Sequence, residues 1–266
     1  MAFNIELDTG KIRSLVGGNL VGSRVLTVQE VDSTNELAKR YFQDDAPEGM
    51  VFLAESQTKG KGRSGRTWHS PPGVGVFLSV LLKPAIPVAQ IPQLTLLAGV
   101  AVAKAVNAIN PLPANLKWPN DILMNGKKLG GILCELVARE GRWGVVIGIG
   151  VNVNHRRDQF PEDLRELATS LYLENNQTTD RTLMAISILE HLDQEYRDFL
   201  QSGMAPLVKS WTRLTGMFGK PVCLTHANES ISGTAQGLDE RGRLVVRMED
   251  GQQRAFDSGE VTLRRE

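Results

Sequence analysis

The sequence predicts an α/β (α+β) protein, in which a mixed β-sheet backed by helices is followed by a small β-barrel. Over most of the chain, short segments rich in β-branched residues alternate with longer segments of helical hydrophobic spacing. The last stretch, of about 50 residues, contains only short alternating segments separated by turns. We therefore expect a larger domain over residues 1–215 and a small β domain over residues 218–266.

The larger domain is expected to start with a short helix that ends at Gly17-Gly18, because glycine pairs stop helices. Its strands are expected over residues 24–31, 50–54, 74–82, 114–118, 127–136 and 143–153, its helices over residues 36–42, 91–109 and 181–200, and a loop from residue 161. The last two strands should form a hairpin that turns at Gly141. In the small domain, strands are expected over residues 221–225, 230–238, 243–248 and 253–256.

The composition is that of an ordinary globular protein, with 41% hydrophobic and 23% charged residues. Thirty basic and thirty acidic residues balance, which argues against binding bulk nucleic acid through overall charge. No run of 18 apolar residues predicts a membrane segment, and the N-terminus lacks a signal-peptide layout, so we expect a cytoplasmic protein with no membrane partner. The two cysteines, Cys134 and Cys223, are too few for a disulfide framework and are expected to be buried thiols.

A glycine-rich basic segment, QTKGKGRSGRTWHS, covers residues 57–70 and is expected to be a mobile loop unless a ligand orders it. It lacks the spacing of a Walker A or a dinucleotide-binding motif. Its glycines nevertheless let backbone N–H groups approach an anion, beside Lys61, Arg63 and Arg66. The competing interpretation is a solvated basic surface loop. The flanking Gln57 and Trp68 argue against it, because an indole at the end of the loop can stack on a purine.

A second polar segment lies at residues 116–136, LKWPNDILMNGKKLGGILCEL. Here Asn120 and Asp121 interrupt a strand. Lys128 then enters an apolar strand, where it must either extend to solvent or point at an anion. The following glycines, Gly130 and Gly131, indicate that a ligand or another backbone lies close, and Lys117 is a secondary candidate.

Two weaker motifs complete the set. The motif GIGVNVN, at residues 148–154, places glycines without side chains in a buried strand. The strand ends at Asn152, whose amide can bind a ligand oxygen. DSTN, at residues 32–35, would cap a helix or recognise a small polar group. The four histidines are scattered without metal-binding spacing, and no nucleophilic triad stands out, so the motifs favour charge neutralisation around phosphates.

Taken in order, DSTN, QTKGKGRSGRTW, KWPNDILMNGKKLGGIL and GIGVNVN closely resemble the motif series of biotin protein ligases. The resemblance covers about residues 24–215, and the β-rich tail from residue 218 resembles that family's SH3-like C-terminal domain. It implies a class II synthetase-like catalytic domain. It also implies an ATP-dependent activity that converts biotin to biotinyl-5′-AMP and transfers biotin to a lysine of a biotin carboxyl carrier domain.

The resemblance also implies roles for individual residues. Lys128 and Arg63 would be catalytic. The biotin site would comprise Ser33, Thr34, Asn35, Gln57, Lys61, Gly62, Arg63, Lys128, Gly131 and Gly148. The ATP and adenylate site would comprise Arg63, Arg66, Trp68, Asn120, Asp121 and Asn152. Mg²⁺ would accompany ATP, with ligands that the sequence does not identify, and a homodimer through the main sheet is a further implication. This chain carries Lys61 where the family commonly has arginine, which keeps the charge but loses the bidentate fork.

Three alternatives remain. A lipoate or octanoate ligase shares the fold and a matching lysine, but the basic GKGRSGRTW loop favours biotin. A biotin-sensing repressor would carry a winged helix-turn-helix of some 60 residues before the DSTN motif, for which the 31 residues ahead of Asp32 are too few. A binding protein without catalysis is disfavoured by the retention of Lys128 and of the whole loop.

Overall fold

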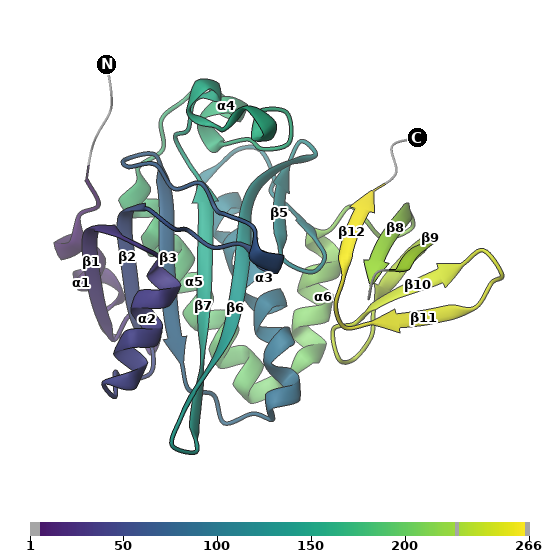
Figure 1. The fold of residues 1–266 in the computed structure, drawn as a ribbon, viewed down its shortest axis with the longest axis horizontal. Helices are drawn as coiled ribbons and strands as arrows, with labels where there is room; N and C mark the ends of the chain where they lie inside the picture. The colour runs from purple at the N-terminus through teal and green to yellow at the C-terminus, as the bar shows by residue number, and fades with distance from the viewer. Residues whose placement is uncertain (1–5, 227–228, 264–266) are drawn as a thin grey trace.

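The computed structural model describes residues 6–226 and 229–263, and its larger part is built on a seven-stranded mixed sheet (Figure 1). The strands are β1 (Arg24–Val31), β2 (Met50–Gln57), β3 (Gly75–Leu82), β4 (Asn115–Lys117), β5 (Asp121–Met124), β6 (Lys127–Arg139) and β7 (Arg142–Asn152). They lie in the order β1-β2-β3-β7-β6-β5-β4, in which β1 and β2 are parallel and every other pair is antiparallel. The predicted mixed sheet is confirmed.

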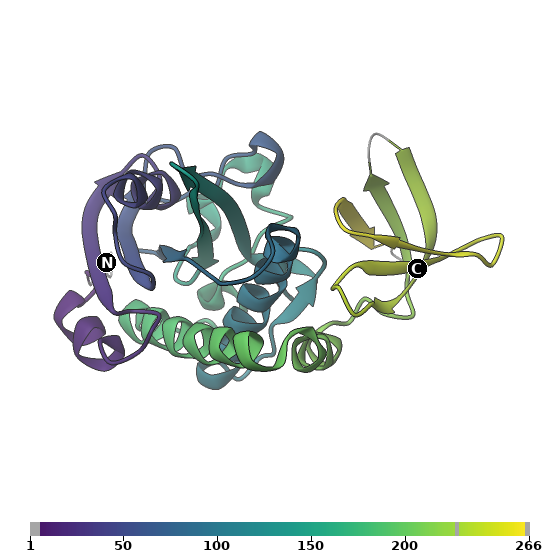
Figure 2. The same cartoon turned by 90° about the horizontal axis from the view of Figure 1, so that it is seen from below.

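Helices cover both faces of this sheet (Figure 2). They are α1 (Thr9–Val16), α2 (Thr34–Gln43), α3 (Ile91–Ile109), α4 (Leu171–Asn175), α5 (Arg181–Ser202) and α6 (Met204–Leu214), with single 3₁₀ turns η1 (Arg63–Gly65), η2 (Val88–Gln90), η3 (Arg157–Gln159) and η4 (Glu162–Leu164). The long helices α3 and α5 pack on one face, and α2 packs on the other. The sheet is therefore the middle layer of three. The short helix α2 covers only part of the sheet face on which it packs.

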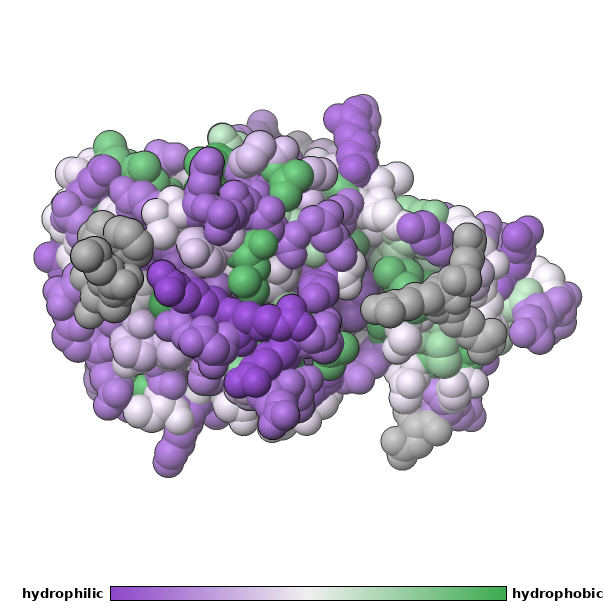
Figure 3. Space-filling view, turned by 90° about the horizontal axis from the view of Figure 1, so that it is seen from above, coloured by the Kyte–Doolittle hydropathy of each residue, from purple (hydrophilic) through white to green (hydrophobic). Residues whose placement is uncertain are grey.

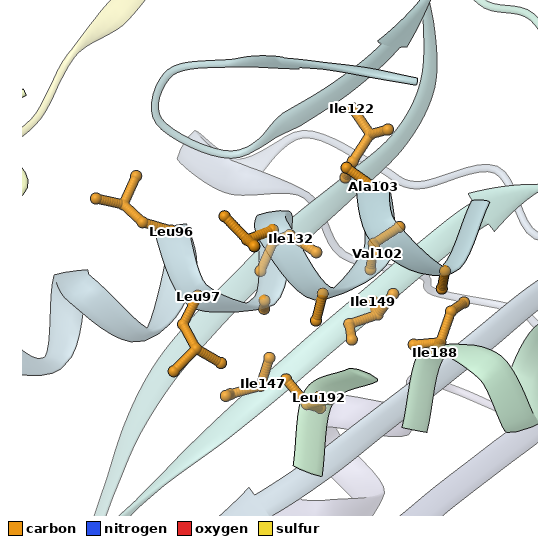
Figure 4. Close-up of a cluster of buried hydrophobic side chains, with 14 of the residues drawn as sticks. Leu96, Leu97, Val102, Ala103, Ile122, Ile132, Ile147, Ile149, Ile188 and Leu192 are labelled. Carbon is orange, nitrogen blue, oxygen red and sulfur yellow. The ribbon is translucent and has the colours of Figure 1, made fainter. Parts of the chain in front are cut away.

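The main core lies between the sheet and the pair α3 and α5. Figure 4 shows Leu97 and Val102 of α3 facing Ile147 and Ile149 of β7, all buried. Among the described residues, Val88–Ile109 is the one helical segment long and apolar enough to span a membrane, but 67% of its apolar window is buried inside the protein. Core helices meet the same criteria, so this is weak evidence for a membrane segment.

The C-terminal part forms a separate five-stranded antiparallel sheet. Its strands are β8 (Pro221–His226), β9 (Glu229–Leu238), β10 (Leu244–Met248), β11 (Gln253–Phe256) and β12 (Glu260–Leu263), in the order β11-β10-β9-β8-β12. This sheet docks on the larger one through Trp118, whose indole is 1% exposed and donates to the carbonyl of Gly242 at 3.3 Å.

Several expectations need correction. The sequence did not indicate β5, β12, α4 or α6. The first three are too short for periodicity to show, and α6 follows α5 after only Gly203. Cys134 and Cys223 are unpaired but half-buried rather than buried, since Cys134 lies where β5 no longer covers β6. The first helix ends at Val16 with Gly17 as its C-cap, as predicted, and residues 1–5 of that segment lie outside the described residues.

Candidate active site

A cavity of about 890 Å³ opens on the face of the main sheet that carries α2. The basic loop of residues 57–70 crosses over it, and β12 of the C-terminal sheet forms one wall (Figure 1). All fifteen residues that the resemblance assigns to the biotin and ATP sites line this cavity: Ser33, Thr34, Asn35, Gln57, Lys61, Gly62, Arg63, Arg66, Trp68, Asn120, Asp121, Lys128, Gly131, Gly148 and Asn152. The surface seen from above is largely hydrophilic, with smaller hydrophobic patches between the polar side chains (Figure 3).

The start of α2 supplies a buried polar cluster. Ser33 is the N-cap by backbone position, yet its side chain makes no capping hydrogen bond. The backbone N–H of Thr34 donates to Gln57 Oε1 at 2.8 Å, and its hydroxyl lies 2.7 Å from that of Ser79. Gln57 Nε2 donates to Ser70 Oγ at 2.8 Å. Helix capping therefore does not account for these side chains, which converge on the cavity floor.

Asn35 extends this cluster across the sheet. Its Nδ2 donates to Glu135 Oε2 at 2.7 Å and to the carbonyl of Leu133 at 3.3 Å, while Oδ1 accepts from Ser79 Oγ at 2.6 Å. The amide lies directly over Gly148, where an added Cβ would come within 2.2 Å of Oδ1. Only glycine at this position lets the amide cross the strand.

Lys128 and Asp121 form the charged part of the cavity. Lys128 Nζ lies 2.5 Å from Asp121 Oδ1, and Lys117 Nζ lies 2.8 Å from Oδ2. Burial raises the pKa of Asp121, but the two lysines outweigh burial and hold the pKa below its ordinary value. Lys128 therefore points at an anion instead of extending to solvent. Its ammonium also lies 5.6 Å from the ring centre of Trp68.

The basic loop is held by specific partners. Arg63 donates to Asn120 Oδ1 at 2.9 Å and contacts the carbonyl of Gly259 at 3.5 Å. Burial lowers the pKa of Arg63, with Asp121 acting in the opposite direction. Lys61 lies 2.6 Å from Glu36. Arg66 forms an ion pair with Glu260. The loop is thus more than a solvated surface segment, because Arg63 is half-buried at the cavity.

The indole of Trp68 explains two of the glycines. A Cβ on Gly150 would come within 2.5 Å of the indole, and one on Gly131 within 3.2 Å. Gly130 is instead approached by the carbonyl oxygen of Gly150, at 2.9 Å from its would-be Cβ. The glycines of these strands were predicted to lie close to a ligand or to another backbone. In the structure they lie close to the backbone of Gly150 and to the ring of Trp68.

Asn120 and Asn152 both bind backbone. Asn152 Nδ2 donates to the carbonyl of Thr169 at 3.0 Å and lies 3.5 Å from that of Lys128. Asn120 Nδ2 donates to the carbonyl of Ile132 at 3.0 Å. Asn152 therefore holds the segment that carries Lys128, and Asn120 holds Arg63.

Sequence reasoning missed Ser70, Ser79, Glu135 and the β12 residues around Gly259. Ser79 is the one polar residue in an apolar strand, and Glu135 is a half-buried residue between Cys134 and Leu136 with no motif around it, so neither stood out. The turn before β12 was not expected to reach the larger domain.

Among the described residues, no group of three or more histidine, cysteine, aspartate or glutamate side chains is arranged to hold a metal ion. Magnesium needs fewer protein ligands, since it usually binds one or two carboxylates together with substrate phosphates. Three carboxylates line the cavity, and the side chain of Asp121 is 14% exposed against 73% for Glu166 and 51% for Glu260. Asp121 is the carboxylate that fits such an ion.

Fold and site together define an α/β protein with a cavity beneath a basic loop, lined by the cationic side chains of Lys61, Arg63 and Lys128. The chain matches the biotin/lipoate A/B protein ligase family over residues 27–152 and the biotin protein ligase C-terminal domain over residues 217–264. It is 36% identical to the bifunctional ligase/repressor BirA of Bacillus spizizenii, across 95% of this chain and 78% of that protein. It is 32% identical to the biotin–[acetyl-CoA-carboxylase] ligase of Mycobacterium tuberculosis, across 90% of each chain.

A solved structure agrees with these relatives. The biotin protein ligase from Aquifex aeolicus in complex with biotin and ATP superimposes with a TM-score of 0.80 at 32% identity, over 91% of this chain and 99% of that one. The chain belongs to the biotin protein ligase family.

Proposed function

We propose that this protein is an ATP-dependent biotin protein ligase that forms biotinyl-5′-AMP and transfers biotin to a lysine of a biotin carboxyl carrier domain. One observation carries the proposal. A single cavity joins a neutral polar floor at Thr34 and Asn35 to a cationic region at Lys128 and Arg63. Such a cavity suits a ligand with a neutral hydrogen-bonding head and a carboxylate that must meet a phosphate.

The first step joins two anions. The biotin carboxylate attacks the α-phosphorus of ATP, a P–O bond forms, and the bond to the departing pyrophosphate breaks. Lys128 and Arg63 stabilise the charge that gathers on the α-phosphate, in a half-buried setting that strengthens their effect. Asp121 holds Lys128 until the anionic reactants compete for it. Alignment of the two reactants supplies up to about 7–11 kcal/mol of the barrier reduction.

The second step transfers the acyl group. The amine of an acceptor lysine attacks the acyl carbon of the adenylate, an amide bond forms, AMP leaves, and the amine loses a proton. The basic loop over the cavity excludes water from the hydrolysable anhydride until the acceptor arrives. No protein nucleophile is required.

The remaining residues take supporting roles in the proposal. Ser33, Thr34, Asn35, Gln57, Gly131 and Gly148 form the biotin site together with Lys61, Gly62, Arg63 and Lys128. Arg66 and Trp68 lie on the adenylate side, where Asn120 and Asn152 hold Arg63 and Lys128 in place. Magnesium would be held by the phosphates of ATP and by Asp121, where it neutralises phosphate charge.

The organisation of the chain is part of the proposal. Residues 1–215 form the catalytic domain and residues 218–266 an SH3-like domain. The second half of β6, Cys134–Arg139, pairs with β7 on one side and with no described strand on the other. This strand edge supports docking of a carrier domain or a second copy in a homodimer. Two unpaired cysteines are compatible with a cytoplasmic location.

The direct test mixes purified protein with biotin, ATP, Mg²⁺ and a carrier domain and measures the mass of the carrier. One added biotinyl group is expected. Lys128→Met should fold normally and lose at least about a hundredfold in pyrophosphate release, because it removes a charge aimed at the reacting oxygens. Lys127→Met, on the neighbouring residue, serves as the matched control. Mass gain from lipoate but not from biotin would show a lipoate ligase instead.

A further inference from the structure

The backbone of Lys128 lies at an irregularity in the main sheet. Strand β5 pairs with β6 through Ile122 opposite Gly130 and Leu123 opposite Lys128, so Leu129 of β6 has no partner on β5. Leu129 is fully buried in the core, whereas Lys128 lines the cavity. An extra residue of this kind changes the direction in which neighbouring side chains point. The direction of the Lys128 side chain therefore depends on what holds the backbone here.

On its other side, Lys128 is held by a loop instead of a strand. The pairing of β6 with β7 begins at Gly130, so Lys128 lies beyond it. There, residues 167–169 form an isolated parallel bridge with β6. The N–H of Lys128 donates to the carbonyl of Leu167 at 2.8 Å, and its carbonyl accepts from the N–H of Thr169 at 2.9 Å. One bridge holds Lys128 only as firmly as this segment is itself held.

Glu174 of α4 connects this segment to the turn on the opposite side of Lys128. Its carboxylate accepts from Asn125 Nδ2 at 2.5 Å and, through its second oxygen, from the hydroxyl of Thr169. Asn125 lies in the turn between β5 and β6, at a φ of 48°. One side chain thus joins the turn that leads into Lys128 to the residue whose N–H binds its carbonyl.

The other contacts of the segment do not replace this connection. Asn152, at the end of β7, donates to the carbonyl of Thr169 at 3.0 Å and so anchors the segment from the β7 side. Lys127 of β6 lies 3.8 Å from Glu166, but the side chain of Glu166 is 73% exposed, so this ion pair contributes little. Within the part of the chain that the structure describes, Glu174 supplies the direct hydrogen bond from the β5–β6 turn to this segment.

The geometry points to Glu174 as a positioning residue for Lys128. By holding Asn125 and Thr169 together, it fixes the backbone on both sides of Lys128 and keeps the ammonium directed into the cavity. Glu174 does not itself line the cavity, so it acts through Lys128 and not on a reactant. This proposal rests on the proposed function, because it concerns the lysine assigned to that reaction.

The expected effect is on the rate more than on binding. Lys128 stabilises charge that gathers in the transition state, so its exact place matters more for kcat than for KM. A displacement of about 1 Å can cost about a hundredfold in rate. Because Asn152 still anchors the segment when Glu174 is lost, a smaller loss of about tenfold is expected.

The first test measures pyrophosphate release with biotin and ATP varied separately. Glu174→Ala should lower kcat about tenfold and change each KM by less than about twofold. Glu174→Gln should stay within about twofold of wild type, because its carbonyl can accept from Asn125 while its NH₂ group donates to the Thr169 hydroxyl. Glu162→Ala, at an exposed position in the same loop, is the control. Equal losses in Glu174→Gln and Glu174→Ala would overturn the proposal.

A double variant separates action through Lys128 from a general structural role. In a Lys128→Met protein, Glu174→Ala should cause no further loss of kcat, because the side chain that it positions is absent. A tenfold further loss would overturn the proposal. Thr169→Val removes the second contact at similar volume and should lower kcat in the same direction as Glu174→Ala; wild-type kcat in both variants would overturn the proposal.

Hydrogen exchange provides a readout without turnover. In Glu174→Ala, the amides of Lys128 and Thr169 should exchange about tenfold faster, while those of β3 stay unchanged. Unchanged exchange at both amides would overturn the positioning role while leaving the ligase function intact. A wild-type protein that releases no pyrophosphate with biotin would instead refute the proposed function.

Discussion

Gly148 shows how one residue decides whether the site can form. The oxygen of Asn35 lies 2.2 Å from the position of a Cβ on this strand residue. Gly148→Ala should displace Asn35 and raise KM for biotin at least about tenfold, because the lost amide contacts leave buried polar groups unpaired. Steady-state kinetics with biotin and ATP varied separately measure this effect. Gly237→Ala is the control, since nothing lies within 4 Å of its Cβ position; an unchanged KM for biotin in Gly148→Ala contradicts the prediction.

His155 is a buried titratable group remote from the charged part of the site. Its ring stacks on Phe160 with centroids 5.0 Å apart and meets the edge of Phe77. Burial, helped by the charges of His69 and Arg181, lowers the pKa of His155 to about 3. An unfolded histidine titrates near pH 6.5, so below that pH the unfolded chain binds a proton that the folded chain does not.

The protein should therefore lose stability as pH falls from about 6.5 toward 3, by up to about 1.4 kcal/mol per pH unit from this residue. Urea unfolding at neutral and at acidic pH measures the loss. His155→Phe keeps a ring against Phe160 and should flatten this dependence, whereas His191→Gln should not. An equally steep loss in His155→Phe would show that other groups carry the acid sensitivity.

At the scale of elements, few backbone hydrogen bonds order the tip of the basic loop. Gly62 N–H donates to the carbonyl of Arg66 at 2.7 Å, and Trp68 N–H to that of Gly60 at 2.9 Å, while Lys61 and Arg66 are exposed. Biotin and ATP together should slow hydrogen exchange of amides in residues 60–67, because an anion recruits the cations and N–H groups. Strands β9 and β10 provide the internal reference. No protection in the presence of both ligands would rule out closure of the loop.

At the scale of the whole molecule, the two sheets meet at Trp118. Its indole is buried between the domains and bound to Gly242. Trp118→Ala should cost about 3–5 kcal/mol of unfolding free energy, the usual range for a buried large-to-small change. Denaturant titration measures this, with the half-buried Trp143 of the β6–β7 hairpin as the comparison. A loss as small as that of Trp143→Ala would mean that the domains do not depend on this contact.

The unpaired edge of β6 makes a second prediction at this scale. Leu136 on that strand is 49% exposed. Leu136→Lys should weaken any homodimer or carrier complex formed through the strand, because an edge lysine opposes strand addition. Sedimentation measures the dimer, and carrier biotinylation measures the complex. Adenylate formation should be unaffected; intact assembly in the variant would place the interface elsewhere.

Local patterns in the sequence sufficed for the long elements and for the charged residues of the site. Alternation of β-branched residues predicts β1 with its observed bounds, and the spacing of apolar residues predicts α3 with its observed bounds. Lys128 and Arg63 stood out because a charge among glycines or apolar residues is unusual in sequence. Both kinds of signal depend on neighbours along the chain, and tertiary structure is not needed to detect them.

What the sequence could not supply depends on register and docking. Ser79 becomes part of the site because β3 pairs with β7 so that it faces Gly148, and Glu135 because Asn35 reaches it over that glycine. Strand β12 has four residues and no periodicity, yet docking of its sheet brings Gly259 to Arg63. The sequence by itself determined which residues carry charge and where most of the longer strands and helices lie, but not the short elements or α6. Tertiary structure decided which hydrogen-bond donors meet which acceptors, because that depends on contacts between residues far apart in the chain.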